Sequence, residues 1–301
     1  MFKTRDASSY DEVIAEFDHF TTLLSAPLAS RLVALAALYS GERILDVGTG
    51  TGIVALQAAQ KVGFNGRVIG IDLSDKMLET ARAKAAQAGL SSCLEFQRMD
   101  AEALALEEQS FDVVLSLFAL LHFPHPLAAL REMFRVLRPG GRVVIGVGSG
   151  PPWFSLPGFL HRMKRVSELF RQFQGKRLFA PKCLNALTQK SLPTGAEQEE
   201  STLASNHHAR THRVPRLVRR AGFVSLHFDW KGHQVEVATA EEFWDLQRTF
   251  SSIARKRLSD ALPEQRCTVK EEFLKICHAV QSRHGKLIYP FASFYVIARR
   301  P

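Results

Sequence analysis

ILDVGTGTG, residues 44–52, is an apolar run that passes directly into a turn with glycine at every second position. A dinucleotide-binding turn needs a further glycine at the position of Ile53, and a Walker-type phosphate loop needs Gly-Lys-Ser or Gly-Lys-Thr, which the chain lacks. Asp46 stands two residues before Gly48, where its carboxylate would repel a pyrophosphate. The turn therefore suits a ligand with an amino group or a cationic centre.

Short apolar runs alternate with helical stretches around this turn. Predicted strands are Arg43–Val47, Val68–Ile71, Leu94–Gln97, Val113–Leu117, Arg142–Val147, Val224–Asp229 and Ala292–Ala298. Predicted helices between them are Ile53–Lys61, Lys76–Ala88 with Ser74 as its N-cap, Leu127–Leu137 and Val214–Ala221. Buried strands that alternate with helices indicate a parallel sheet covered on both faces. We predict an α/β, Rossmann-like, seven-stranded and mostly parallel sheet with a helical cap formed by insertions.

Four segments are expected along the chain. Residues 1–40 hold two N-terminal helices, the second with Pro27 near its start and closed by Gly41, and residues 41–150 form the ligand-binding core. Residues 151–213 are a cap insertion with a helix at 161–173 and a mobile loop at 188–212. Residues 214–301 end the sheet and hold a second insertion of two helices at about 240–284.

Two further acids end the next strands of the predicted sheet. Asp72 can accept hydrogen bonds from a ribose diol, and Asp100 can accept one from the exocyclic amine of adenine. The N–H of Ala101 can then meet a ring nitrogen. An amino acid, a ribose and an adenine with no phosphate between them describe S-adenosylmethionine.

At these residues the chain resembles the class I S-adenosylmethionine-dependent methyltransferases, of the ubiquinone/menaquinone-biosynthesis (methyltransferase type 11) group. The matching stretches lie in family order over about residues 40 to 147 and are ILDVGTGTG, GIDLSDKML, MDAEAL, FDVVLSLFALLHFPHP and LRPGGRVVI. The resemblance implies that Leu73 and Met77 sandwich the adenine, that the backbone of Ser116 faces the methionine part, and that Tyr10 lies in an N-terminal helix that closes over the cofactor. The cofactor-binding residues expected from turn and resemblance together are Asp46, Gly48, Thr49, Gly50, Gly52, Asp72, Leu73, Met77, Asp100, Ala101, Ser116 and Tyr10.

Several of these residues also have ordinary structural explanations. Asp46 can orient the glycine turn, Asp100 can cap a helix, and Tyr10 can serve packing alone. His122 is the strongest candidate for a general base because it follows the fourth strand and histidine is the residue type most often used for this role, although a histidine there can instead orient its loop. His233 and Tyr289 are weaker candidates.

The acceptor is expected to be a small molecule that is lipophilic or aromatic, methylated at oxygen, nitrogen or carbon. The Asn/Asp-Pro-Pro-aromatic motif of amino-directed enzymes is missing after the fourth strand, since the similar PPW at residues 151–153 follows the fifth, and no Pro-Cys nucleophile appears there. Aromatic residues of the predicted cap, among them Phe243, Trp244 and Phe250, can pack internally or line a pocket.

Composition bears on partners and location. The net charge of +9 is concentrated in the C-terminal half. It leaves an RNA or protein methyltransferase as the alternative function and an anionic membrane surface as an alternative partner, while DNA is not expected. A catalytically silent cofactor-binding protein is a further alternative, but its motifs would be expected to decay and here they are intact. The glycine spacing argues against a nicotinamide-dependent oxidoreductase. Four scattered cysteines without a CxxC pair argue against a metal site, and with no secretory signal they indicate a cytoplasmic location.

Overall fold

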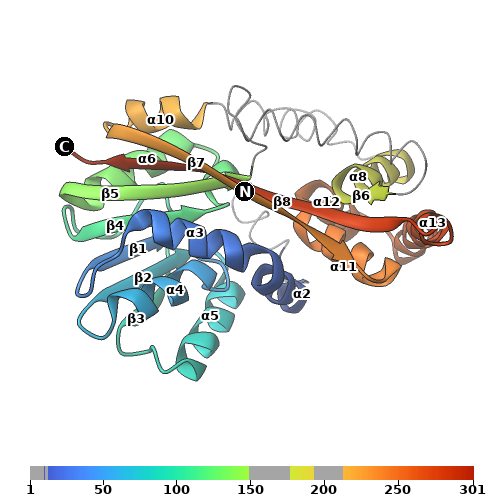
Figure 1. Cartoon of the computed structure of the whole chain (residues 1–301), viewed down its shortest axis with the longest axis horizontal. Coiled ribbons are helices and arrows are strands. Elements are labelled where there is room, and N and C mark those ends of the chain that lie inside the picture. Colours follow the sequence, from blue (N-terminus) through green and yellow to red (C-terminus); the bar gives the residue numbers. More distant parts are fainter. Residues whose placement is uncertain (1–9, 11–12, 149–176, 193–212) are drawn as a thin grey trace.

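The computed structural model describes Tyr10 and residues 13–148, 177–192 and 213–301. Within these residues an eight-stranded sheet runs in the order β3-β2-β1-β4-β5-β8-β6, with β7 also paired to β8 (Figure 1). The strands are β1 Arg43–Val47, β2 Arg67–Asp72, β3 Leu94–Arg98, β4 Phe111–Leu117, β5 Leu137–Gly148, β6 Arg177–Phe179, β7 Val224–Val237 and β8 Lys286–Arg299. Strands β1 to β5 are parallel, and β8 runs antiparallel to β5 and β7.

The predicted fold class is confirmed, and all seven predicted strands are present. The three-residue β6 is an addition, and it pairs with the first residues of β8. Strands β7 and β8 are each 14 residues long, twice the length predicted or more. Strand β7 is paired only with β8 among the described strands, and half of its residues are exposed. Its polar sequence lacks the apolar run by which the inner strands are identified.

Helices cover both faces of the sheet, as predicted. One face packs against α3 Ala26–Ala36, α4 Ile53–Val62 and α5 Asp75–Gln87, and the other against α6 Pro126–Val136 and α10 Val214–Arg220. Successive side chains of a strand point to opposite faces of the sheet. In β1, Ile44 packs in a first core with α3, α4 and α5, and Leu45 packs in a second core with α6 and α10. Ser74 caps α5 as expected, with its hydroxyl accepting the Met77 N–H.

The N-terminal helices form one continuous rod. Helix α2 (Ile14–Phe20) passes through a π-helical turn, η1 (Thr21–Ser25), straight into α3, which has proline at its start as predicted. The expected closure by Gly41 is wrong, because the helix ends at Ala36 and Ala37 takes the left-handed conformation with φ of 47°.

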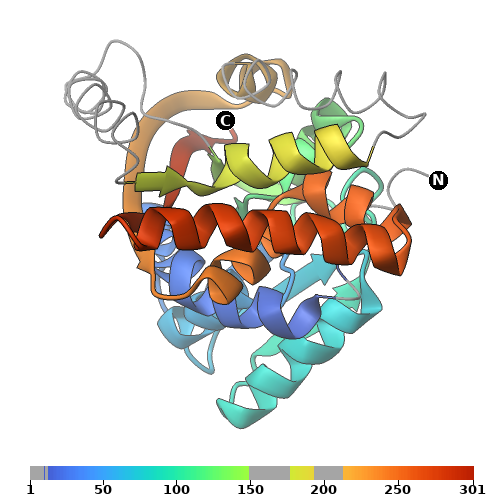
Figure 2. The same ribbon diagram turned by 90° about the vertical axis from the view of Figure 1, so that its right-hand side faces the viewer.

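The other helices gather at the far end of the β7–β8 ribbon (Figures 1 and 2). They are α8 Ala180–Ser191, α11 Ala240–Phe250, α12 Ser252–Asp260 and α13 Pro263–Gln281. Three helices replace the two expected at 240–284, because the Ser251 side chain starts α12 and Pro263 starts α13. Residues 188–191 belong to α8 instead of a loop, while 193–212 and the expected helix at 161–173 lie outside the described residues.

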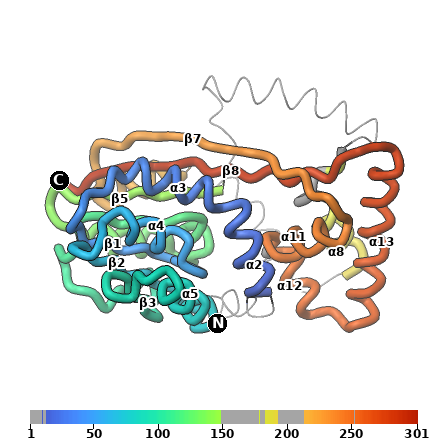
Figure 3. Tube along the Cα trace, turned by 60° about the horizontal axis from the view of Figure 1, so that its bottom comes forward, coloured from blue at the N-terminus to red at the C-terminus, as the bar shows by residue number. Residues whose placement is uncertain are grey.

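These helices share a third core with the N-terminal rod. Phe20 and Leu24 pack there with Phe243, Trp244 and Phe273. The ends of β7 and β8 contribute Val237 and Leu287. The chain trace shows α2 beside α11 and α12 (Figure 3). The four-segment division of the chain stays a prediction. No helix in the described part of the chain is both long and apolar enough to cross a lipid bilayer.

Candidate active site

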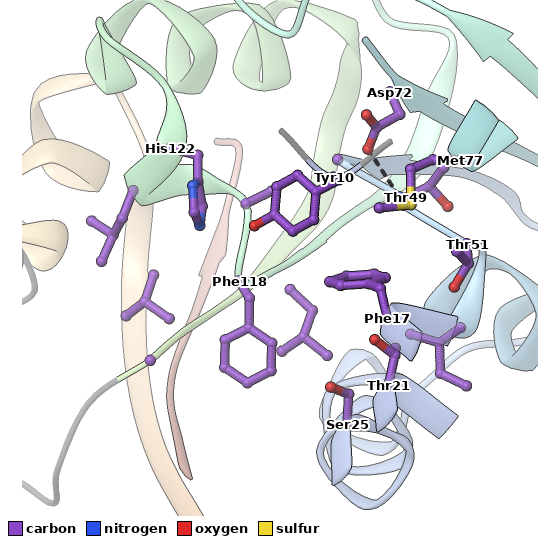
Figure 4. A pocket seen from close by; sticks show the side chains of 18 of the residues that line it. Tyr10, Phe17, Thr21, Ser25, Thr49, Thr51, Asp72, Met77, Phe118 and His122 are labelled. Carbon is purple, nitrogen blue, oxygen red and sulfur yellow. Dashed lines mark hydrogen bonds between the residues drawn. The ribbon is translucent and has the colours of Figure 1, made fainter. Parts of the chain in front are cut away.

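A cavity of about 640 Å³ opens where β1, β2 and β4 end (Figure 4). Ligands of open α/β sheets bind at this edge, and the volume lies in the usual range for small-molecule sites. The predicted site residues that line it are Tyr10, Gly48, Thr49, Gly50, Asp72, Leu73, Met77, Asp100, Ala101 and His122. The structure therefore brings together residues from five separate stretches of sequence.

The glycine turn forms the floor of this cavity. Gly48, Gly50 and Gly52 all have positive φ, which glycine adopts without steric cost. The N–H groups of Gly48 and Thr49 both donate to the Ile71 carbonyl at 2.9 Å, which fixes the turn to β2. A Cβ atom at Gly48 would lie 2.2 Å from the Ala119 Cβ atom, so the turn packs directly against the loop after β4.

Asp46 lies behind the turn and does not line the cavity. Its carboxylate is 1% exposed and accepts a 2.7 Å hydrogen bond from the Thr49 hydroxyl. Burial raises the pKa of Asp46 to about 7, although the bond from Thr49 opposes that shift. The contacts of Asp46 thus orient the turn from inside the protein.

Asp72 lines the cavity and binds the backbone of the glycine turn. One carboxylate oxygen accepts the Gly50 N–H at 2.9 Å, and the other accepts the N–H groups of Leu73 and Ser74 at 2.8 and 3.1 Å. Burial raises the pKa of Asp72, while these bonds and the nearby His122 oppose the rise. Each carboxylate oxygen can accept two bonds, so the oxygen facing Gly50 keeps capacity for a ligand hydroxyl.

The other predicted residues fall on the wall or just behind it. Asp100 lines the cavity, and its side chain also accepts the Glu102 N–H at 2.9 Å, so it caps a turn while facing the site. Gly52 and Ser116 do not line the cavity. Gly52 lies against Phe96 at the start of α4, and the buried Ser116 hydroxyl ties β4 to β1 by donating to the Val47 carbonyl at 2.9 Å.

The three candidates for a general base, His122, His233 and Tyr289, differ in their position relative to the cavity. His122 ends the short helix η2 (Leu120–His122) and points into the cavity (Figure 4). Tyr289 also lines the cavity, and burial raises the pKa of its phenol far above neutral, so Tyr289 stays protonated and cannot serve as a base. His233 lies outside the cavity wall, where burial lowers its pKa.

Sequence reasoning missed most of an aromatic wall on the other side of the cavity. It is formed by Phe17, Phe118, Trp230, Phe250, Tyr289 and Phe291. Four of the rings make a continuous series, with centroid separations of 5.8 Å from Phe17 to Phe250, 5.4 Å from Phe250 to Phe291 and 5.1 Å from Phe291 to Phe118. Of the cap aromatics considered from the sequence, Phe250 joins this wall, whereas Phe243 and Trp244 pack in the third core.

Phe118 occupies a strained position in this wall. Its φ is 62°, a left-handed conformation that costs an L-residue about 1–3 kcal/mol. Such strain persists only where the surroundings hold it, and it gathers at functional sites. Phe118 follows the end of β4 at once, so the strand-end reasoning applied to Asp72 could have found it.

Comparison with known proteins agrees with the geometry of the site. Residues 44–141 match a family described as a methyltransferase domain. The chain is 36% identical over 144 residues to the ubiquinone/menaquinone biosynthesis C-methyltransferase UbiE of Pseudomonas putida, a match that covers 46% of this chain and 56% of that protein. It is 33% identical over 142 residues to the aklanonic acid methyltransferase DauC of Streptomyces sp. (strain C5), covering 47% and 64%. The matches thus span a little over half of each relative.

Solved structures of similar fold align with most of the chain. The [4+2]-cyclase SpnF aligns with a TM-score of 0.54 and 20% identity, over 92% of this chain and 81% of that one. The YcgJ protein from Bacillus subtilis aligns with a TM-score of 0.52 and 17% identity, over 90% and 97%. By sequence, residues 44–141 are similar to methyltransferase domains of the S-adenosylmethionine-dependent class. Within that class the domain is similar to the UbiE group, as the sequence motifs predict.

Proposed function

We propose that this protein is an S-adenosylmethionine-dependent methyltransferase that acts on a small lipophilic or aromatic acceptor. One observation carries the proposal: a single cavity joins a polar half, built from the glycine turn and strand-end acids, to an aromatic half. UbiE and DauC, which match this domain, are both named as methyltransferases. Because a named cyclase shares the fold, methyl transfer itself has to be measured.

The polar half supplies groups suited to the cofactor. Asp72 has acceptor capacity for a ribose hydroxyl, and Met77 and Leu73 offer apolar surface for adenine beside it. Asp100 and the Ala101 backbone, at the next strand end, supply an acceptor and a donor for the adenine edge. We assign Asp46, Gly52 and Ser116 to holding these groups in place from behind.

The aromatic half would hold the acceptor and exclude water. When bound, S-adenosylmethionine supplies a methyl group on a sulfonium whose charge disperses during transfer. Catalysis then depends mainly on alignment at near-attack distance in a dry site, which rings from four elements and the loop after β4 can provide. His122 is the proposed base where the acceptor must lose a proton, since it is the imidazole that lines the described cavity wall.

The direct test uses S-adenosylmethionine carrying a radiolabelled methyl group. The purified protein is incubated with a cell lysate, and the products are separated into organic extract, aqueous small molecules, RNA and protein. Label in the small-molecule or organic fraction is expected. Label in RNA or protein would favour the basic half as a binding surface instead, and cofactor binding without any transfer would contradict the enzymatic function.

Cofactor binding is tested at Asp72. Asp72→Ala should weaken binding of S-adenosylhomocysteine by about 1–3 kcal/mol in calorimetry, because it removes the acceptor proposed for the ribose and frees the turn. Asp75→Ala is the matched control, since Asp75 is an exposed acid three residues further on that makes only a 3.4 Å surface pair with Arg98. Equal affinities for both variants would refute the assignment.

A further inference from the structure

The π-helical turn η1 brings two hydroxyl side chains into the cavity wall. Thr21 and Ser25 begin and end this turn, line the cavity, and are only 5% and 3% exposed. In Figure 4 both hydroxyls come from the same turn and lie beyond Phe17, at the end of the cavity away from Asp72 and Met77. Single π-helical turns within helices occur frequently at functional sites.

The Thr21 hydroxyl is buried and has no hydrogen-bond partner among the described residues. A helical threonine usually donates to a carbonyl in the preceding turn, as Thr249 does to Asp245 at 2.7 Å and Thr80 to Lys76 at 3.1 Å. An unsatisfied buried hydroxyl costs about 1–3 kcal/mol. A ligand in the cavity beside Thr21 that supplied the missing hydrogen bond would recover part of this cost.

The surroundings of Thr21 define the chemistry of that ligand. Phe17 stands one turn before Thr21, and Phe118 lies across from it. Among the described lining residues, the acids are Asp72 and Asp100 and the one basic side chain is His122. None of these stands on the π-helical turn. Flat rings next to neutral hydroxyls suit an uncharged aromatic molecule with an oxygen substituent.

We propose that Thr21, with Ser25 beside it, hydrogen-bonds an oxygen substituent of the acceptor, which is a neutral aromatic ring carrying a hydroxyl or carbonyl group. The inference rests on the proposed function, because that function assigns this half of the cavity to the acceptor. Thr21 is then a positioning residue: it fixes how the ring lies against the aromatic wall and so which atom faces the methyl donor.

Equilibrium binding of two probes tests the proposal. The full chain, saturated with S-adenosylhomocysteine, is titrated with 1-naphthol and with naphthalene, which differ only in the hydroxyl. Thr21→Val, which keeps the shape of the side chain, should reduce the preference for 1-naphthol about three- to tenfold, the equivalent of one hydrogen bond. Thr21→Ser should retain the preference. Thr249→Val is the matched control, because Thr249 is also buried but lies outside the cavity wall.

Three results would overturn the proposal. They are a wild-type chain that does not distinguish the probes, a Thr21→Val chain that keeps the full preference, and a Thr21→Val chain whose main defect is weaker binding of S-adenosylhomocysteine. The last would assign the hydroxyl to the cofactor. The probe titration reads binding alone and the labelled-methyl assay reads transfer. Loss of transfer with an intact Thr21-dependent preference would therefore count against the proposed function and support the ligand assignment.

Discussion

At the scale of single residues, the site depends on the lack of a side chain at one glycine of the turn. Gly48 has no Cβ, and this lets the first turn lie against the loop that carries Phe118 and His122. Gly89 has a similar φ, 68° against 72°, but a Cβ there would meet nothing within 4 Å. The two glycines therefore separate backbone strain from close packing.

Gly48→Ala should destabilise the protein more than Gly89→Ala and should also abolish binding of S-adenosylhomocysteine. Both substitutions place an L-residue in the left-handed region at a cost of about 1–2 kcal/mol, but only the first drives a methyl group into Ala119. Thermal unfolding and calorimetry measure the two effects. Equal losses of stability with retained binding in Gly48→Ala would show that the turn yields easily.

Asp46 makes stability depend on pH in a direction opposite to most carboxylates. Its pKa is about 7 in the folded protein and ordinarily 3.8, so between these values the folded chain holds a proton that the unfolded chain has lost. The contribution is complete below about pH 4 and is lost as the pH rises through 7. Each unit of difference between the two pKa values changes the free energy of unfolding by about 1.4 kcal/mol.

Asp46→Asn removes this titration while keeping the size of the side chain. The free energy of unfolding of the wild-type protein, taken relative to that of Asp46→Asn, should fall by a few kcal/mol between pH 4 and pH 7. Urea titrations across that range measure it. A difference that stays flat or grows with pH would place the carboxylate in a wetter site than its 1% exposure indicates.

At the scale of helices and strands, the inner strands β1 to β4 could be predicted from the sequence, but the full length of β7 and β8 could not. Strands β1 to β4 are short apolar runs between turn signals, and their predicted bounds agree with the structure to within two residues at each end. The β7–β8 ribbon extends past its apolar stretch because pairing between two strands holds it, which no local pattern records. Ser251 and Pro263 are residue types that start helices, so the breaks before α12 and α13 have a signal in the sequence.

Ser251 connects two helices of the third core. Its hydroxyl accepts the Ala254 N–H at 3.2 Å, which caps α12, and donates to the Asn185 side chain of α8 at 2.6 Å. Ser251→Ala should lower the free energy of unfolding by about 1.5–3 kcal/mol, because it loses both the cap and the link. Thr239→Ala, which removes only the cap of α11, should cost about 1 kcal/mol. Denaturant melts compare them, and a ranking in the opposite order would contradict the linking role.

At the scale of the whole molecule, residues far apart in the chain build the two halves of the cavity by different means. The polar half could be predicted because parallel strands end at one edge, so strand-end residues converge. The aromatic half could not, since Phe17, Phe118, Phe250 and Phe291 share no local spacing. Phe17 and Phe250 meet because the N-terminal rod and the C-terminal helices pack in one core, and Phe118 and Phe291 join them from the ends of β4 and β8.

The start of α3 is fastened to β8 by a buried hydrogen bond. The Tyr295 hydroxyl, at 0% exposure, donates to the Leu28 carbonyl at 2.9 Å. Tyr295→Phe should lower the free energy of unfolding by about 1 kcal/mol and weaken binding of S-adenosylhomocysteine, since α3 continues the rod that lines the cavity. Tyr39→Phe, at an exposed ring, is the control. Unfolding curves and calorimetry report both effects, and indistinguishable variants would mean that the rod is held elsewhere.

The π-helical turn makes the length of the chain, and not only its composition, a determinant of selectivity. A π turn closes over one residue more than an α turn, so Thr21 and Ser25 face the cavity because the rod contains that additional residue. Loss of a single codon at the solvent-facing Leu23 would let α2 and α3 merge into an ordinary helix and rotate everything before it by about 100°. A one-residue insertion or deletion in this turn would thus change the wall that faces the acceptor while the glycine turn, Asp72 and Asp100 keep their places.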